Sequence, residues 1–196
     1  MAGIISRLFS KNSHETRLAP AKTTKIIVCA FDPKFSVLVQ EDSAAYLNHY
    51  PHTNTVIFSN ADEFEKELEK HFDVVHLFCD VDETGAIEGT NYSGSGLIRR
   101  CYVAGVTLLW IASENDANGY INGFHPEGRP INLVMTINRK GAAFQAFLSE
   151  LLAKMATGKS MPRAWVEIAP QTTSAPIQEE LPETIFSAGF GQLRLL

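Results

Sequence analysis

The stretch KIIVCAF, residues 25–31 of this 196-residue chain, is an unbroken apolar run closed by the turn signal Asp32-Pro33. An apolar run this short indicates a strand buried on both faces, which is typical of the centre of a parallel sheet. Similar runs follow it along the chain, at 55–58 (TVIF), 74–79 (VVHLFC), 106–112 (VTLLWIA) and 131–137. Together these runs predict five strands, and the order of strands and helices predicts a mostly parallel sheet.

The segments between these runs carry helical patterns. The predicted helices cover residues 35–50, 61–71, 97–104, 140–156 and 160–169. Asn60 is placed to cap the second helix, and Gly105 and Gly158 are placed to end the third and fourth. Residues 114–130 predict a long loop or a broken helix.

We therefore expect one three-layer α/β/α sandwich with a sheet of five to six strands over residues 25–196. Residues 1–24 predict a flexible N-terminal segment, 170–185 an extended segment and 186–196 an edge strand. For residues 1–10, which contain a few apolar side chains, a frayed terminus is favoured over membrane contact.

Composition narrows the classes of function. The net charge of −5 argues against nucleic-acid binding, which needs a basic face. Three cysteines, two of them inside apolar runs, indicate reduced thiols and a cytoplasmic location. Nothing in the sequence calls for a cofactor.

In parallel sheets, ligands bind beyond the carboxyl ends of the strands. The residues at those ends are Asp32, Ser59, Asp80, Ser113 and Asn138. The candidate site is therefore expected among these residues and their loops.

The sequence from Asp80 to Thr84, DVDET, matches the D-x-D-x-T motif of haloacid-dehalogenase-like phosphatases. Those enzymes also need a later acidic pair for Mg²⁺, and this chain has no Asp after Asp116. The match is interpreted as chance. A metal site from Asp80, Asp82, Glu83 and Glu88 is the alternative, but a solvated acidic hairpin explains them better, and no metal is predicted.

Two strands resemble those of caspase-like CHAT domains. Residues 73–80, DVVHLFCD, are similar to the family strand that reads Asp, two hydrophobic residues, His, three further residues and His-Gly. Residues 106–115, VTLLWIASEN, are similar to the family's next strand, which ends in Leu-x-Ala-Cys. The later order also resembles the family: a strand at 131–137, a long helix, Gly158-Lys159-Ser160, a final helix and a terminal strand.

The resemblance implies a protease-like site whose catalytic pair is missing. Asp80 stands where the family has its catalytic histidine, and Ser113 stands where it has its cysteine. A carboxylate is a weak base for activating a serine, so the resemblance implies a pseudoenzyme that binds a protein or peptide in a cleft near Asp80 and Ser113. Asp82, Asn115 and Asp116 are the expected binding residues beside that cleft.

Three further interpretations complete the sequence-based picture. A hydrolase led by Ser113, with His125 or Asp80 as its assistant, stays as the alternative function. A receiver-like regulatory domain would need an acidic cluster after the first strand, which Asp32-Pro33 alone does not supply. His76, about 13 Å along the strand from Asp80 at ~3.3 Å per residue, is expected to be a core histidine with a hydrogen-bond partner, and Cys79 a buried apolar residue.

Overall fold

Strand β1 (Lys25–Ala30) is buried from Ile26 onward and has a parallel neighbour on each side, β2 (His52–Ile57) and β3 (Val74–Phe78). The computed structural model describes residues 23–113, 123–124, 131–137, 142–172 and 183–187. Because β1 pairs on both edges and carries side chains into both cores, the prediction of a central strand is confirmed.

The sheet has the strand order β2-β1-β3-β4-β5-β6. β4 (Leu108–Ser113) and β5 (Asn132–Ile137) continue the parallel pairing, and β6 (Glu183–Ser187) runs antiparallel to β5. Five strands are therefore parallel and one edge strand is not, which confirms the mostly parallel sheet.

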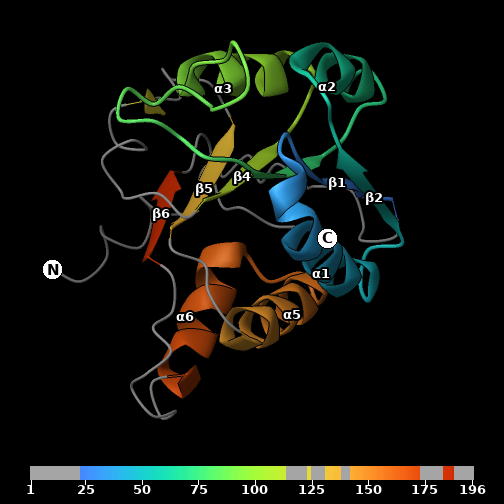
Figure 1. Cartoon of the computed structure of the whole chain (residues 1–196). Helices are drawn as coiled ribbons and strands as arrows, with labels where there is room; N and C mark the ends of the chain where they lie inside the picture. Colours follow the sequence, from blue (N-terminus) through green and yellow to red (C-terminus); the bar gives the residue numbers. More distant parts are fainter. Residues whose placement is uncertain (1–22, 114–122, 125–130, 138–141, 173–182, 188–196) are drawn as a thin grey trace, which may run out of the picture.

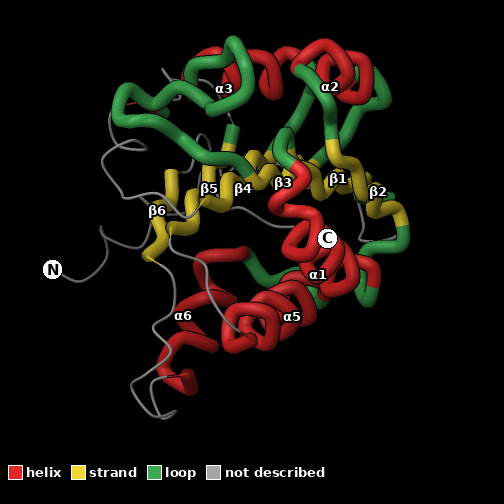
Figure 2. Tube along the Cα trace, viewed as in Figure 1, coloured by secondary structure: helices red, strands yellow, loops and turns green. Residues whose placement is uncertain are grey.

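Helices cover both faces of this sheet (Figure 1, Figure 2). α2 (Ala61–Leu68) and α3 (Gly94–Val103) lie on one face. The other face carries α1 (Ser36–Leu47), α5 (Ala142–Ala156) and α6 (Met161–Thr172). The three-layer sandwich expected from the sequence is the observed architecture.

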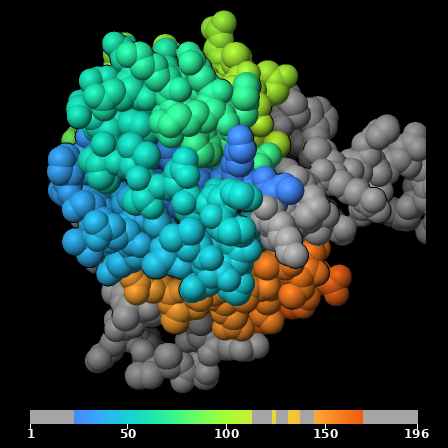
Figure 3. All heavy atoms as spheres, turned by 90° about the vertical axis from the view of Figure 1, so that its right-hand side faces the viewer, coloured from blue at the N-terminus to red at the C-terminus, as the bar shows by residue number. Residues whose placement is uncertain are grey.

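The direction of the connections explains which helix lies on which face. The chain steps from β1 outward to β2, then back across β1 to β3 and onward to β4. Right-handed crossovers place helices on opposite faces when the direction reverses, so α1 lies opposite α2 and α3. Figure 3 views the molecule from the β2 edge, with the α2 segment above β2 and the α5 segment below it.

Alternate residues of each strand feed two separate cores. Val28, Phe78 and Trp110 pack with α1, α5 and α6, whereas Cys29 and Leu77 pack with α2 and α3. The continuous apolar runs in the sequence therefore reflect burial on both faces of the sheet.

The predicted helix caps are present. The Asn60 side chain accepts a hydrogen bond from the Glu63 amide at 3.0 Å, which caps α2. Gly105 and Gly158 have φ angles of 86° and 89°, a region that glycine adopts without the cost of a Cβ, and they follow α3 and α5 as predicted.

Several predicted boundaries are wrong. β2 begins at His52 instead of residue 55, and α1 and α2 end at Leu47 and Leu68 instead of residues 50 and 71. α3 begins at Gly94 instead of residue 97, because the Ser93 hydroxyl caps it by accepting from the Gly96 amide. α6 continues to Thr172, so residues 170–172 are helical and not extended; Pro170 falls in the last turn, where losing one backbone hydrogen bond does not stop the helix. The edge strand starts at Glu183, which pairs with Ile137, and residues 188–196 lie outside the described residues.

Among the described residues, no helix combines the length and the apolar character that a membrane span requires. Residues 1–22, which include the segment considered for membrane contact, lie outside the described residues.

Candidate functional site

The candidate site lies where the carboxyl ends of β1, β3 and β4 meet at one edge of the sheet. The register pairs Ala30 with Phe78 and Phe78 with Ala112. The Cys79 amide donates to the Ala112 carbonyl at 3.1 Å, so β3 and β4 stay paired up to their ends. Asp80 is therefore two positions past Phe78, and Ser113 is one position past Ala112, on neighbouring strands.

Asp32 begins the turn after β1. Its side chain accepts a hydrogen bond from the Lys34 amide at 2.8 Å and caps a short 3-10 helix, Pro33–Phe35. Because α1 starts directly after this turn, the turn holds Lys34 above the end of the neighbouring strand β3.

Lys34 and Asp80 form an ion pair at this edge. The Lys34 ammonium donates to Oδ2 of Asp80 and lies 3.8 Å from Oδ2 of Asp32. The Asp80 side chain is 15% exposed, whereas those of Lys34 and Asp32 are about half exposed. The hydrogen bond to Asp80 raises the pKa of Lys34, so this side chain stays charged.

Asp82 builds the loop that follows Asp80. Its Oδ1 accepts hydrogen bonds from the Thr84 hydroxyl and from the amides of Thr84 and Ala86 at 2.6–2.9 Å. These bonds, led by that of the Thr84 hydroxyl, lower the pKa of Asp82. A bridge between Val81 and Ile87 closes the hairpin, so Asp82 shapes the loop in addition to exposing a carboxylate there.

His76 lies in the core, below the site. Its ring stacks between Phe78 and Trp110, with centroids 5.0 and 4.8 Å away. Nδ1 lies 3.2 Å from the Tyr46 hydroxyl, and Nε2 lies 3.5 Å from the Asp42 carboxylate. The prediction of a core histidine with a hydrogen-bond partner is confirmed, and its full burial keeps the imidazole away from the sheet edge.

The three cysteines are free and buried. Burial raises the pKa of Cys29 and Cys79 and brings that of Cys101 to about 12. A thiolate is the reactive form of cysteine, so these thiols behave as apolar core groups, as expected for Cys79.

Two loops at this edge touch each other. A Cβ added to Gly123 would come within 2.3 Å of the Gly85 Cα, and the Ser95 hydroxyl donates to the Gly123 carbonyl at 3.2 Å. Phe124 is buried in the core beneath α3. The chain after β4 is therefore anchored on the hairpin that follows β3.

Part of the predicted site lies outside the described residues. The Ser113 side chain and residues Asn115, Asp116 and His125 lie outside what the structure describes. Within the described part of the chain, no three His, Cys, Asp or Glu side chains gather as a metal site, so the DVDET motif has no metal cluster there.

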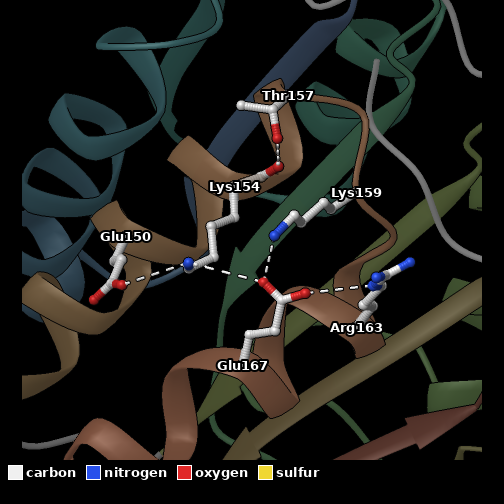
Figure 4. Close-up of polar contacts among 6 residues, drawn as sticks. All are labelled: Glu150, Lys154, Thr157, Lys159, Arg163 and Glu167. Carbon is white, nitrogen blue, oxygen red and sulfur yellow. Dashed lines mark hydrogen bonds and ion pairs between the residues drawn. The ribbon is translucent and has the colours of Figure 1, made fainter.

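A second polar cluster joins α5 and α6 (Figure 4). Glu167 accepts from Lys159 and Arg163, and Lys154 lies 3.8 Å from it and 4.0 Å from Glu150. The hydrogen bond from Lys159 lowers the pKa of Glu167. The cluster connects the end of α5 to the first two turns of α6 and lies apart from the strand ends that carry Asp80.

Sequence reasoning missed Lys34, Asp42 and Tyr46. Lys34 follows a recognised turn, but its ion pair depends on β1 and β3 being neighbours. Of these three residues, Asp42 alone could have been recognised from its sequence neighbours. It lies between Val39 and Tyr46 on the buried face of α1, and an acidic residue is unusual on a helix face that packs on a sheet.

Neither the models of protein families nor the curated proteins give a match to this chain.

Proposed function

We propose that this chain is a caspase-like domain of CHAT type that binds a basic peptide segment at the carboxyl edge of its sheet and does not cleave it. The ion pair between Lys34 and Asp80 carries the proposal, because it occupies the position where the resemblance places a catalytic histidine. The chain order of the elements also supports the proposal. β5 is followed by α5, α6 and β6, and the CHAT domains that the sequence resembles have the same order of a strand, a long helix, a final helix and a terminal strand.

The geometry at Asp80 favours binding over catalysis. A general base needs an oxygen within hydrogen-bond reach of the proton that it removes. Lys34 already donates to Oδ2 of Asp80, and this side chain is only 15% exposed. His76, the histidine of the same strand, is fully buried between Phe78 and Trp110.

The charge at this edge indicates the chemistry of the partner. The Lys34 ammonium contacts the Asp80 carboxylate and lies 3.8 Å from that of Asp32, and the charge of Glu88 also raises the pKa of Lys34. The exposed Asp82 adds a further negative charge on the same hairpin. A lysine or arginine of a partner can therefore share these carboxylates, with complementary charge setting the preference.

The test is a selection of displayed peptides on the full chain, followed by affinity measurements with the selected synthetic peptides. We expect enrichment of lysine and arginine, and about a tenfold loss of affinity for Asp80→Asn and for Glu88→Gln. Glu41→Gln, on the exposed face of α1, is the matched control and should bind normally. Selected peptides without basic residues, or full affinity of both site variants, would refute the proposal.

A serine hydrolase is the second candidate. It is favoured by the hydrogen bond between the Cys79 amide and the Ala112 carbonyl, which keeps the strand ends that carry Asp80 and Ser113 side by side. Mass spectrometry of the selected peptides after incubation with the protein separates the two functions. Cleavage that Ser113→Ala abolishes would establish the hydrolase, whereas intact peptides support binding without turnover.

A further inference from the structure

A second hollow, distinct from the sheet edge at Asp80, lies between α2 and α3. It encloses about 530 Å³, a volume within the range of ligand pockets. α2 precedes β3 and α3 precedes β4, so the hollow reaches the ends of both helices near the amino ends of these strands. The residues lining this α2–α3 groove are Glu65, Leu68, Glu69, His71, Arg99, Arg100, Val103 and Ala104.

One pair of charges in the groove is locked. Glu65 accepts hydrogen bonds from Arg100 and from the Tyr92 hydroxyl, and the Arg100 guanidinium lies 4.5 Å from the centre of the Tyr92 ring. The hydrogen bond from Arg100 lowers the pKa of Glu65, so both groups are charged and satisfied. This network links α2 to α3 beside the groove.

A second pair of charges is available to a ligand. Glu69 follows α2 and Arg99 lies on α3, both exposed on opposite walls. Neither side chain makes an ion pair or a side-chain hydrogen bond with any residue in the described part of the chain. The last residue of each helix gives the groove an apolar side chain: Leu68 on α2, which is 4% exposed, and Val103 on α3, which is 77% exposed.

His71 stands at the end of the groove in a backbone conformation that normally selects glycine. Its φ angle is 57°, the only positive value at a non-glycine residue among those described. For a residue with a Cβ this conformation is unfavourable, because the Cβ comes too close to the following carbonyl oxygen. The imidazole Nδ1 lies 3.4 Å from the Ala104 carbonyl and places the ring at the junction of the two helices. His71 thus occupies a position whose backbone conformation glycine would adopt more easily.

We propose that the α2–α3 groove binds a peptide segment of a partner protein, which inserts one aliphatic side chain beside Leu68 and Val103. An acidic residue of the peptide pairs with Arg99, and a basic residue pairs with Glu69. Charge complementarity assigns this occupant, because the same groove is lined by apolar side chains and by two unengaged charges of opposite sign. The inference does not depend on the sheet edge at Asp80, since the two surfaces share no residue.

The probe is a displayed library of random peptides, selected on the full chain in which Asp80→Asn and Glu88→Gln remove the competing acidic edge. We expect enriched peptides that carry an aliphatic residue flanked by an acid and a base. With the selected synthetic peptides, Arg99→Glu should weaken binding about tenfold or more, and a peptide with its acid changed to lysine should recover it.

Two further variants separate binding from folding. His71→Gly should keep or raise the melting temperature, because it relieves the backbone cost, while it lowers affinity for the selected peptides. Val103→Asp, at an exposed position, should leave the melting temperature unchanged and abolish binding. Selected peptides that bind both variants at full affinity would overturn the proposal.

Analytical ultracentrifugation of the unliganded chain tests whether a second copy of this chain occupies the α2–α3 groove. Self-association that Val103→Asp abolishes would assign the groove to a second copy of this chain and would also overturn the peptide proposal. A monomer at the concentrations used for binding supports it.

Discussion

Oδ2 of Asp42 on α1 lies 3.5 Å from Nε2 of His76 on β3, and both side chains are completely buried. The same imidazole meets the Tyr46 hydroxyl, one turn along α1, at 3.2 Å. Burial is the main cause that raises the pKa of Tyr46, and the Asp42 charge adds to it. This polar cluster joins α1 to the centre of the sheet, where the His76 ring stacks between Phe78 and Trp110.

Removing one member of this cluster should be costly. We expect Asp42→Ala to lower the free energy of unfolding by about 3–5 kcal/mol, because it leaves polar groups buried without their partner. The double variant Asp42→Leu with His76→Leu should lose less than the sum of the two single variants. Urea denaturation of all four variants measures these losses, and additive losses would show that the two residues do not act as a pair.

The Asp82 carboxyl should titrate according to its contacts in the hairpin. Thr84→Val removes the strongest of the hydrogen bonds that lower its pKa, so we expect the pKa to rise toward the usual value near 3.9. Carbon-13 NMR of the side-chain carboxyl measures this. Thr90→Val, in the same hairpin but bonded to the Ile87 carbonyl, is the control and should leave the Asp82 pKa unchanged.

The sign of the linked effect on stability follows from the direction of that shift. A carboxyl with a lowered pKa in the folded state takes up its proton more readily when the chain unfolds. The Asp82 carboxylate therefore stabilises the folded state above the pKa that Asp82 has in the unfolded chain. This stabilisation is lost as the pH falls through the lower pKa that Asp82 has in the folded state. Thr84→Val should therefore reduce the loss of stability on acidification, measured by urea denaturation between pH 5 and 2.

Gly123→Ala should disturb the contact between the two loops at the sheet edge. Its Cβ would lie 2.3 Å from the Gly85 Cα, a backbone atom that cannot move aside alone. We expect a loss of about 1–3 kcal/mol in the free energy of unfolding. Gly89→Ala, with φ of 73° and no atom within 4 Å of the added Cβ, measures backbone strain alone and should cost about 1–2 kcal/mol. Equal stability of Gly123→Ala and the parent would show that the loops do not touch.

The three cysteines should resist labelling in the folded protein. All are buried, and burial raises the thiol pKa, to about 12 for Cys101, so almost no thiolate forms at neutral pH. We expect labelling by a disulfide reagent to follow unfolding, with a rate that rises with urea. In Val103→Cys the new thiol, at a position that is 77% exposed, should react at once. Immediate reaction of the parent would contradict this burial.

The sequence determined the strands, the helices and the edge of the sheet at which to look. Continuous apolar runs identify buried strands because burial on two faces removes the alternation of polar and apolar residues, and β1, β3 and β4 were predicted on that basis. Since parallel strands end at a common edge, the placement of Asp80 next to the end of β4 could also be predicted. Helix ends were less predictable, as α6 shows by passing Pro170.

Only the tertiary structure decided which distant residues meet. Lys34 pairs with Asp80, and Asp42 with His76, because β1 lies beside β3 and α1 packs across both; no local pattern encodes that proximity. The α2–α3 groove has the same origin, since its two walls come from separate crossovers that meet only once the sheet has formed. Periodicity in a sequence reports how each segment is buried, whereas contacts between segments depend on the order in which the strands pair.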